Sequence, residues 1–144
     1  MNNLTIRQYH PQDEEDVISL WSECNLIVPH NNPKHDIERK MKVNPEWFLV
    51  GEIDGRITGT CMAGYEGHRG WINYLAISPA YQRRGLATRM MKEAERLLRN
   101  VGCPKINLQV RTSNVDVIEF YKSISFSIDD VVSMGKRLEQ DSPL

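Results

Sequence analysis

Apolar residues recur every three or four positions through residues 86–101, with charged residues between them. This spacing puts the apolar side chains on one face and predicts an amphipathic helix, which Gly102 is placed to end. Residues 13–24 show the same period behind a run of acidic residues, whose negative charge suits the first turn of a helix. Two shorter helices are expected at residues 36–42 and 114–125, with Asp36 and Asn114 as their N-caps.

Apolar runs bounded by turn residues predict the strands. Residues 47–53 and 56–65 flank Asp54-Gly55, a pair that supplies the positive φ angles of a tight type I′ hairpin. A second short turn leads into residues 71–77, so three consecutive antiparallel strands are expected. The remaining predicted strands lie at residues 4–8, at residues 105–110 and, as one or two closing strands, from Phe126 onward.

The order of these elements predicts an α+β domain of mixed α/β character. Its central mixed sheet would have about six to seven strands, flanked by about four helices. The chain has 144 residues, which suits one domain over residues 1–144, and it shows no internal repeat or linker.

Composition narrows the classes of function. Lys and Arg total 18 against 19 Asp and Glu, so there is no basic excess of the kind that nucleic-acid binding requires. Three scattered cysteines, Cys24, Cys61 and Cys103, indicate neither a disulfide framework nor a zinc site, and no metal is expected. No signal peptide or membrane-length apolar run is visible, so we expect a cytoplasmic protein that does not bind a membrane.

Residues 82–87, Gln-Arg-Arg-Gly-Leu-Ala, stand where the strand at 71–77 gives way to the helix at 86–101. A helix N-terminus presents unpaired N–H groups that can surround a phosphate, and small residues such as Gly85 permit close approach. The two arginines add positive charge, although a plain solvated turn would have the same composition. The chain contains neither GxxxxGK[ST] nor GxGxxG, which excludes the Walker and dinucleotide-binding fingerprints.

Residues 82–87 match the Q/R-x-x-G-x-G/A signature, and the chain resembles the GNAT N-acetyltransferases over nearly its whole length. Residues 72–91 are similar to the fourth strand, pyrophosphate loop and third helix of that family. Residues 114–126 are similar to its later N-x-x-x-x-x-F-Y-x-x-x-x-F helix. A likeness to the small bacterial YpeA-type members rests on residues 36–41, 67–70, 102–106 and 135–138.

The resemblance implies acetyl-CoA as the acetyl donor. In this family the loop amides hold the coenzyme A pyrophosphate, and the backbone of Leu75, Ala76 and Ile77 would pair with the pantetheine arm as an added strand would. Asn114 would touch the coenzyme, or would act only as an N-cap. The loop residues implied in coenzyme binding are Gln82, Arg83, Arg84, Gly85, Leu86, Ala87 and Thr88.

The resemblance also implies that Tyr121 protonates the departing coenzyme A thiolate. A phenol has an ordinary pKa near 10, so it can donate a proton at neutral pH. The alternative is that Tyr121, which follows Phe120 on an apolar face, only packs in the core.

The base that would take a proton from the acceptor amine is left open. Many family members place a glutamate on the fourth strand, where this chain has Asn73 or Tyr74, neither of which is a base. Glu66 and His68, in the preceding turn, are substitutes that also read as ordinary turn residues. A water chain that ends on backbone carbonyls is a further alternative, and a strand N–H near Leu75 would polarise the thioester carbonyl.

Ser125 is a second departure from the family pattern, which usually has glycine at this helix end. A left-handed backbone there costs a serine about 1 kcal/mol, so we expect this end to be rebuilt.

The function expected from the resemblance is acetyl-CoA-dependent N-acetyltransfer, directly to a primary amine of a small molecule, an amino acid or a peptide. The alternative is a non-catalytic acyl-CoA-binding or regulatory module, which the missing strand carboxylate favours and Tyr121 opposes. Residues 26–35 would border the acceptor site without identifying the acceptor. Dimerisation is common in the family, so a homodimer is among the expected assemblies.

Overall fold

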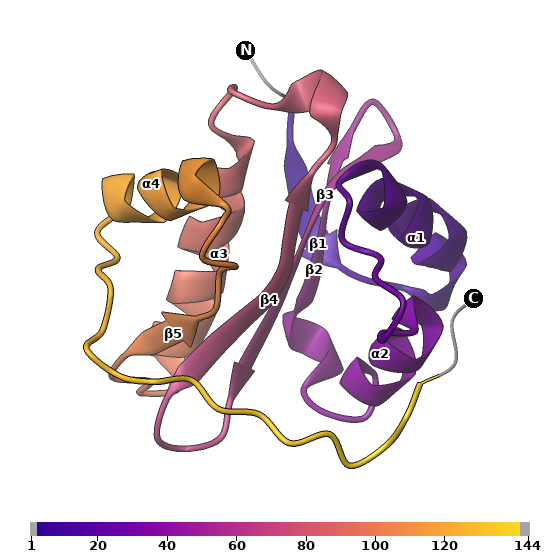
Figure 1. Ribbon diagram of the computed structural model, residues 1–144. Coiled ribbons are helices and arrows are strands. Elements are labelled where there is room, and N and C mark those ends of the chain that lie inside the picture. Colours follow the sequence, from indigo (N-terminus) through magenta and orange to yellow (C-terminus); the bar gives the residue numbers. More distant parts are fainter. Residues whose placement is uncertain (1–2, 142–144) are drawn as a thin grey trace.

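The computed structural model describes residues 3–141, in which a five-stranded sheet separates two pairs of helices (Figure 1). The strands are β1 (Thr5–Gln8), β2 (Phe48–Ile53), β3 (Arg56–Tyr65), β4 (Gly70–Ile77) and β5 (Ile106–Leu108). The helices are α1 (Glu14–Glu23), α2 (Pro33–Lys40), α3 (Leu86–Asn100) and α4 (Val115–Ser123). Three short 3₁₀ turns are η1 (Pro11–Asp13), η2 (Pro45–Trp47) and η3 (Pro79–Tyr81).

The sheet is mixed, as the sequence predicts. Its strand order is β1-β2-β3-β4-β5; the first four strands pair antiparallel, and β5 runs parallel to β4 after the chain returns through α3. The predicted hairpin is confirmed, because Asp54 and Gly55 have φ angles of 51° and 75°, as a type I′ turn requires.

The expected strand count of six to seven is wrong for the described residues, which contain five strands. The difference lies in residues 124–141, called here the C-terminal segment, which contains no strand. Side chains attach its first part to β5, since Asp129 accepts hydrogen bonds from Lys105 and Asn107. The segment then crosses to α2, as the yellow chain in Figure 1 shows, where Asp141 pairs with Arg39.

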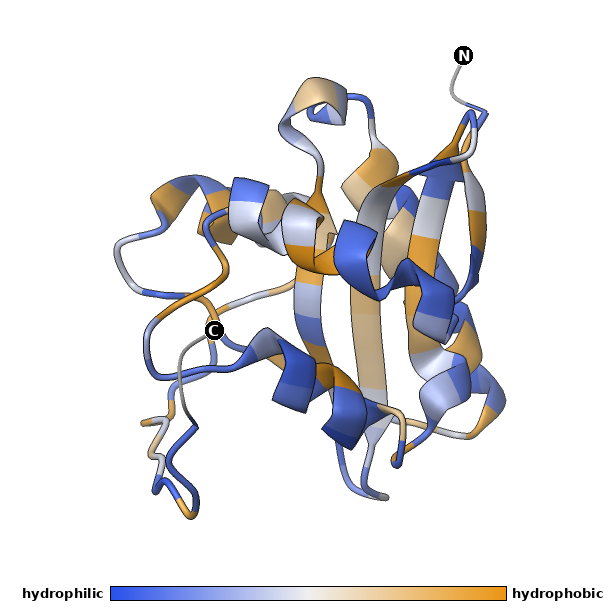
Figure 2. Cartoon of the chain, turned by 90° about the vertical axis from the view of Figure 1, so that its right-hand side faces the viewer, coloured by the Kyte–Doolittle hydropathy of each residue, from blue (hydrophilic) through white to orange (hydrophobic). Residues whose placement is uncertain are grey.

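Two apolar cores lie on opposite faces of the sheet. Successive residues of β3 alternate between them: Cys61 and Ala63 pack with α3 and α4, and Met62 packs with α1 and α2. Figure 2 looks onto the α1–α2 side, where hydrophilic positions predominate on the helices that face the viewer. None of the helices within residues 3–141 combines the length and apolarity that crossing a bilayer requires.

Helix α2 begins earlier than the sequence predicts. Asn32, and not Asp36, is its N-cap, because the Asn32 side chain accepts hydrogen bonds from the backbone N–H groups of Lys34 and His35. Asp36 therefore lies inside the helix, with its carboxylate available to other partners.

The end of α4 keeps the left-handed turn, so the expected rebuilding does not occur. Ser125 has a φ of 79° and its N–H donates to Lys122 O, while the N–H of Phe126 donates to Tyr121 O. These are the two hydrogen bonds of a Schellman motif, and the Phe126 ring completes it by packing 5.4 Å from the Tyr121 ring. The serine is accommodated because this hydrogen bonding and packing outweigh its conformational cost.

Replacing Ser125 with glycine should raise the free energy of unfolding by about 1 kcal/mol, because glycine adopts positive φ without strain. Urea unfolding followed by circular dichroism measures the change. The matched control is Ser123→Gly, at the last residue of α4, which should lower the stability by roughly 0.5 kcal/mol because glycine disfavours a helical backbone. A lower stability for Ser125→Gly would contradict the strain assigned to this position.

Candidate functional site

One edge of β4 is open over part of its length. β5 pairs with β4 only through Gly70, Trp71 and Ile72, and within the described chain no strand lies beside this edge beyond Ile72. The opposite edge stays paired with β3 as far as Ile77. An extended ligand could therefore add to the open edge by backbone hydrogen bonds, and the predicted pantetheine positions Leu75, Ala76 and Ile77 lie on it.

A β-bulge interrupts β4 where this open edge begins. Asn73 pairs with Met62 and Ala76 pairs with Thr60, so Tyr74 and Leu75 together face the single residue Cys61. Tyr74 carries the distortion in its backbone, with a φ of 51°. Bulges bend a strand and re-aim its side chains, and they are frequent beside active sites.

The loop after β4 has the conformation of an anion-binding nest. Arg83 and Gly85 have φ angles of 64° and 77°, while Arg84 between them does not have a positive φ. This alternation turns successive backbone N–H groups toward one side. Gly85 is the N-cap of α3, so the unpaired N–H groups of the first helical turn lie at the same place.

Side chains around the loop hold it and add positive charge. Gln82 Nε2 donates a hydrogen bond of 3.1 Å to Ile77 O, which ties the loop to the end of β4. The Arg84 guanidinium lies 5.3 Å from the centre of the Tyr81 ring, a cation–π contact. Gln82, Arg83, Arg84 and Gly85 are exposed, whereas Leu86 is buried in the core and anchors the helix start.

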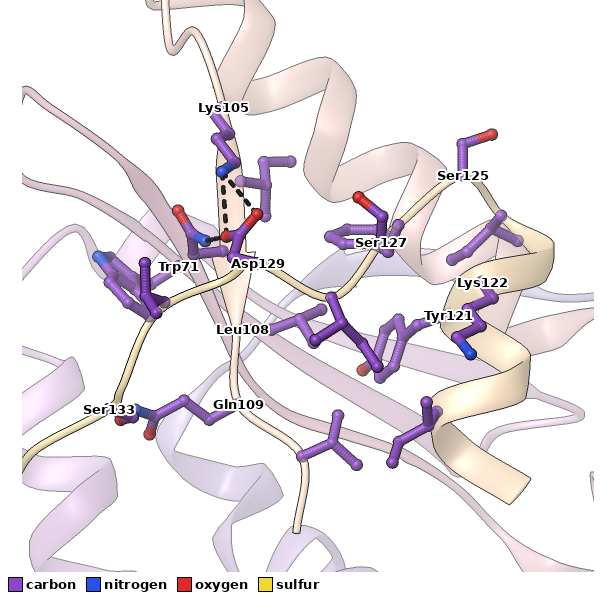
Figure 3. A pocket seen from close by; sticks show the side chains of 18 of the residues that line it. Trp71, Lys105, Leu108, Gln109, Tyr121, Lys122, Ser125, Ser127, Asp129 and Ser133 are labelled. Carbon is purple, nitrogen blue, oxygen red and sulfur yellow. Dashed lines mark hydrogen bonds and ion pairs between the residues drawn. The ribbon is translucent and has the colours of Figure 1, made fainter. Parts of the chain in front are cut away.

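Tyr121 projects from α4 into a large groove, beside Leu108 (Figure 3). Its ring packs against Phe120 and Phe126, and the residue is only 9% exposed. No hydrogen bond from its hydroxyl is seen within residues 3–141. Burial, and to a lesser degree the Cys61 thiol, raises the pKa of Tyr121 above its ordinary value, so the phenol is a protonated donor at neutral pH.

The groove itself has a volume of about 1120 Å³ and lies between β5, α4 and the C-terminal segment. Of the site residues expected from the sequence, Tyr121 alone lines it in the described structure; the loop at 82–88 and residues 75–77 lie elsewhere. The predicted coenzyme positions therefore lie along β4 and at the start of α3, and Tyr121 lies on α4, which packs on the same face of the sheet as α3.

Asn114 lies at the start of α4, and Glu66 lies in the hairpin before β4. Asn114 occupies the N-cap position of α4, is exposed, and makes no capping hydrogen bond with its side chain. Glu66 lies in the hairpin that begins β4, and its Oε1 accepts hydrogen bonds from the N–H groups of His68 and Arg69. These bonds lower the pKa of Glu66, and the hairpin is four strand residues, roughly 13 Å, from the bulge. Glu66 and His68 are therefore not brought together with the loop.

One contact at the bulge could not be foreseen from the sequence. The Tyr74 hydroxyl donates a hydrogen bond of 2.6 Å to Oδ2 of Asp36, which lies on α2. The two residues are 38 positions apart and Asp36 was expected to be a helix cap, so no local pattern could have indicated this pair. Within the described residues no group of three or more His, Cys, Asp or Glu side chains is placed to hold a metal ion.

Comparisons with known proteins indicate a family of acetyltransferases. The family model described as "Acetyltransferase (GNAT) family" matches residues 12–126. A protein named "Acetyltransferase" from Yersinia pestis (strain Pestoides F) is 44% identical over 138 residues, which cover 96% of this chain and 98% of the relative.

Two solved structures share the fold. Ard1 from Thermoplasma volcanium superposes with a TM-score of 0.75 at 24% identity, covering 88% of this chain and 84% of that one. The aminoglycoside N-acetyltransferase AAC(6′)-Iy, solved in complex with CoA, superposes with a TM-score of 0.76 at 16% identity, covering 96% and 97%. Because the family model extends from the start of α1 to the turn after α4, and the Yersinia relative matches almost end to end, the chain belongs to the acetyltransferase (GNAT) family.

Proposed function

We propose that this protein is an acetyl-CoA-dependent N-acetyltransferase that moves the acetyl group directly to a primary amine. The observation that carries the proposal is the continuity of two features. The open edge of β4 leads, through the short turn η3, into the left-handed loop that caps α3. An extended arm and a diphosphate can therefore bind side by side, and coenzyme A contains both.

The coenzyme would bind along this path. Its pyrophosphate would accept hydrogen bonds from the N–H groups at the start of α3, with Arg83 and Arg84 supplying positive charge. The pantetheine arm would pair with the backbone of Leu75–Ile77, and the exposed amide of Asn114 is available from α4. AAC(6′)-Iy, which shares the fold, was solved in complex with CoA, and this supports coenzyme A as the ligand.

Tyr121 would act as the general acid. When the amine nitrogen attacks the thioester carbonyl, the bond between carbon and sulfur breaks and the coenzyme leaves as a thiolate. The Tyr121 hydroxyl would give its proton to that sulfur, and the nitrogen would release its excess proton to solvent as the amide forms. The resulting phenolate would be reprotonated from solvent. A buried phenol with a raised pKa is held in the protonated form that this step needs.

Direct transfer is favoured because buried cysteines are poor carriers of the acetyl group. Cys61 lies in the same core as Tyr121 and is completely buried, and burial raises the pKa of its thiol to about 12. Burial also raises the pKa of Cys24. A thiolate is the nucleophilic form, so neither residue is activated at neutral pH.

The test is to incubate the protein with acetyl-CoA and a panel of small amines, amino acids and peptides, following release of free thiol. We expect release that depends on the amine, with a matching acetylated product by mass spectrometry. Binding of acetyl-CoA should be measured in parallel by calorimetry. Tight binding without turnover across the panel would overturn the proposed activity and leave a coenzyme-binding module.

A further inference from the structure

Tyr74, the residue at the bulge, is held by three contacts. Its ring stacks on Trp21 with centroids 3.8 Å apart, and its carbonyl accepts a hydrogen bond of 2.8 Å from the hydroxyl of Thr60. That hydroxyl accepts a hydrogen bond of 2.9 Å from Trp21 Nε1, so ring and backbone belong to one network. Its own hydroxyl donates to Asp36 at 2.6 Å. A left-handed backbone in a tyrosine persists only where its surroundings determine it this fully, and such positions cluster at active sites.

Asp36 connects the bulge with solvent. Its side chain is 25% exposed, with Oδ2 on the Tyr74 hydroxyl and Oδ1 3.4 Å from Arg39 Nη1. Arg39 makes its closer contacts elsewhere, to Asp141 at 2.8 Å and to Glu139 at 3.0 Å. Arg39 is therefore shared among three carboxylates and is not dedicated to Asp36.

Tyr74 and Tyr121 lie on opposite faces of the sheet. Tyr74 packs with the α1–α2 core, together with Trp21, whereas Tyr121 belongs to the α3–α4 core. The thioester would lie along β4 between them, since Tyr74 immediately precedes the proposed pantetheine positions. A proton can thus be removed from the amine on one face and delivered to the sulfur on the other.

We propose that Asp36 is the base of the reaction and accepts the proton of the acceptor ammonium through the hydroxyl of Tyr74. This inference rests on the proposed N-acetyltransferase function. The N–H bond of the ammonium breaks and its proton moves to Tyr74 Oη, while the proton already on Oη moves to Asp36 Oδ2. The neutral amine then attacks the thioester, and the Asp36 carboxylic acid returns its proton to water.

Tyr74 remains neutral in this step. Burial and the adjacent Asp36 carboxylate raise the pKa of Tyr74 above its ordinary value, so it relays a proton and does not store one. The relay replaces the strand glutamate that the sequence lacks at Asn73 and Tyr74. The relay serves an acceptor that is protonated at neutral pH, as a primary alkylamine with a pKa near 10 is.

The charged groups around Asp36 and Tyr74 come from α2 and from the C-terminal segment. Arg39 faces Asp36 from α2 itself, and Tyr74 faces it from β4. The C-terminal segment supplies Asp141, whose charge acts on Tyr74, and Glu139, which reaches Asp36 only through Arg39. His35 Nδ1 lies 3.6 Å from Asp141. Arg137 lines the same small pocket as Arg39, Glu139 and Asp141, so three carboxylates face two arginines here, and the remaining negative charge favours a cationic acceptor.

The experiment compares Asp36→Asn and Tyr74→Phe with the wild-type chain, measuring kcat/KM for a primary amine between pH 6 and pH 10. We expect each variant to lose roughly 30-fold at pH 7, less than the usual contribution of a general base because water reaches the part-exposed carboxylate. The deficit should shrink toward pH 10, where about half of the amine is already deprotonated. The dissociation constant of acetyl-CoA should not change.

Two controls separate the relay from a structural role. Asp13→Asn removes a more buried carboxylate that pairs with Arg7, and Tyr65→Phe removes a tyrosine hydroxyl that donates to Gly67 O. Both should keep the wild-type pH profile. Tyr74→Phe retains the ring that stacks on Trp21, so it tests the relay even if Asp36→Asn unfolds.

The outcomes distinguish the two proposals. A wild-type protein that acetylates no amine overturns the proposed function. A wild-type protein that is active, with variants that lose the same factor at every pH or lose nothing, overturns the Asp36–Tyr74 relay alone.

Discussion

Replacing Tyr121 with phenylalanine should lower kcat for acetyl transfer by roughly 300-fold, while the affinity for acetyl-CoA stays as it is. The variant keeps the ring that packs against Phe120 and Phe126, so only the hydroxyl is lost. Without that donor the thiolate must leave unprotonated or take a proton from water. Thiol release under saturating substrates measures kcat, and calorimetry measures the affinity.

The pH dependence of the wild-type enzyme follows from the same hydroxyl. Because burial raises the pKa of Tyr121, the protonated form persists above pH 10, and this residue should cause no loss of rate on the alkaline side up to that pH. Tyr121 acts in its protonated form. Raising its pKa therefore extends the active range to higher pH, whereas lowering its pKa would shorten that range.

The matched control is Tyr9→Phe. Tyr9 is also buried, with its pKa raised to about 12 chiefly by burial, but it packs with the α1–α2 core, where its ring stacks on Phe48. Loss of its hydroxyl should leave kcat within about threefold of wild type. A Tyr121→Phe enzyme that is equally active would show that Tyr121 only packs in the core and does not donate the proton.

Replacing Thr88 with glutamate should weaken coenzyme A binding by roughly 100-fold, or about 2.8 kcal/mol. Thr88 is the third residue of α3, so the new carboxylate would lie among the N–H groups that the pyrophosphate needs and would repel its negative charge. The fold should not suffer, because a carboxylate in a first turn stabilises a helix by about 0.3–1 kcal/mol. Calorimetric titration with coenzyme A measures the affinity, and urea unfolding measures the stability.

Asn100→Glu adds the same charge to the same helix, at its exposed far end. We expect it to bind coenzyme A as the wild-type chain does and to be slightly less stable, because a carboxylate opposes the helix dipole there. If Thr88→Glu bound coenzyme A normally, the start of α3 would not be the pyrophosphate site.

Local sequence patterns predicted the conformation correctly wherever neighbouring residues determine it. The period of apolar residues predicted a helix over 86–101, and α3 extends over Leu86–Asn100. Asp54-Gly55 predicted the hairpin because few residue pairs adopt two consecutive positive φ angles. The conformation of the loop before α3 also depends on one local residue. Gly85 has the left-handed conformation that a close approach to the helix N-terminus requires.

Local patterns failed where the conformation depends on distant partners. Residues 126–138 have the apolar content of strands, but Ile128, Val131 and Val132 are exposed, and side-chain bonds to Lys105 and Asn107 replace a backbone ladder. Ser125 was expected to reshape the end of α4. Its cost is outweighed by the Schellman hydrogen bonds and by the packing of Phe126 on Tyr121.

By itself, the sequence determined the class of fold and the family resemblance, and it predicted the donor side of the site, because a helix start, a turn and a glycine act through adjacent atoms. The proposed acceptor side follows only from the tertiary structure. Tyr74 meets Asp36 because the β4 bulge turns one residue toward α2, and Trp21 and Thr60 hold it there. These residues come from four separate segments, and only the packing of α1 and α2 on the sheet brings them within hydrogen-bonding distance.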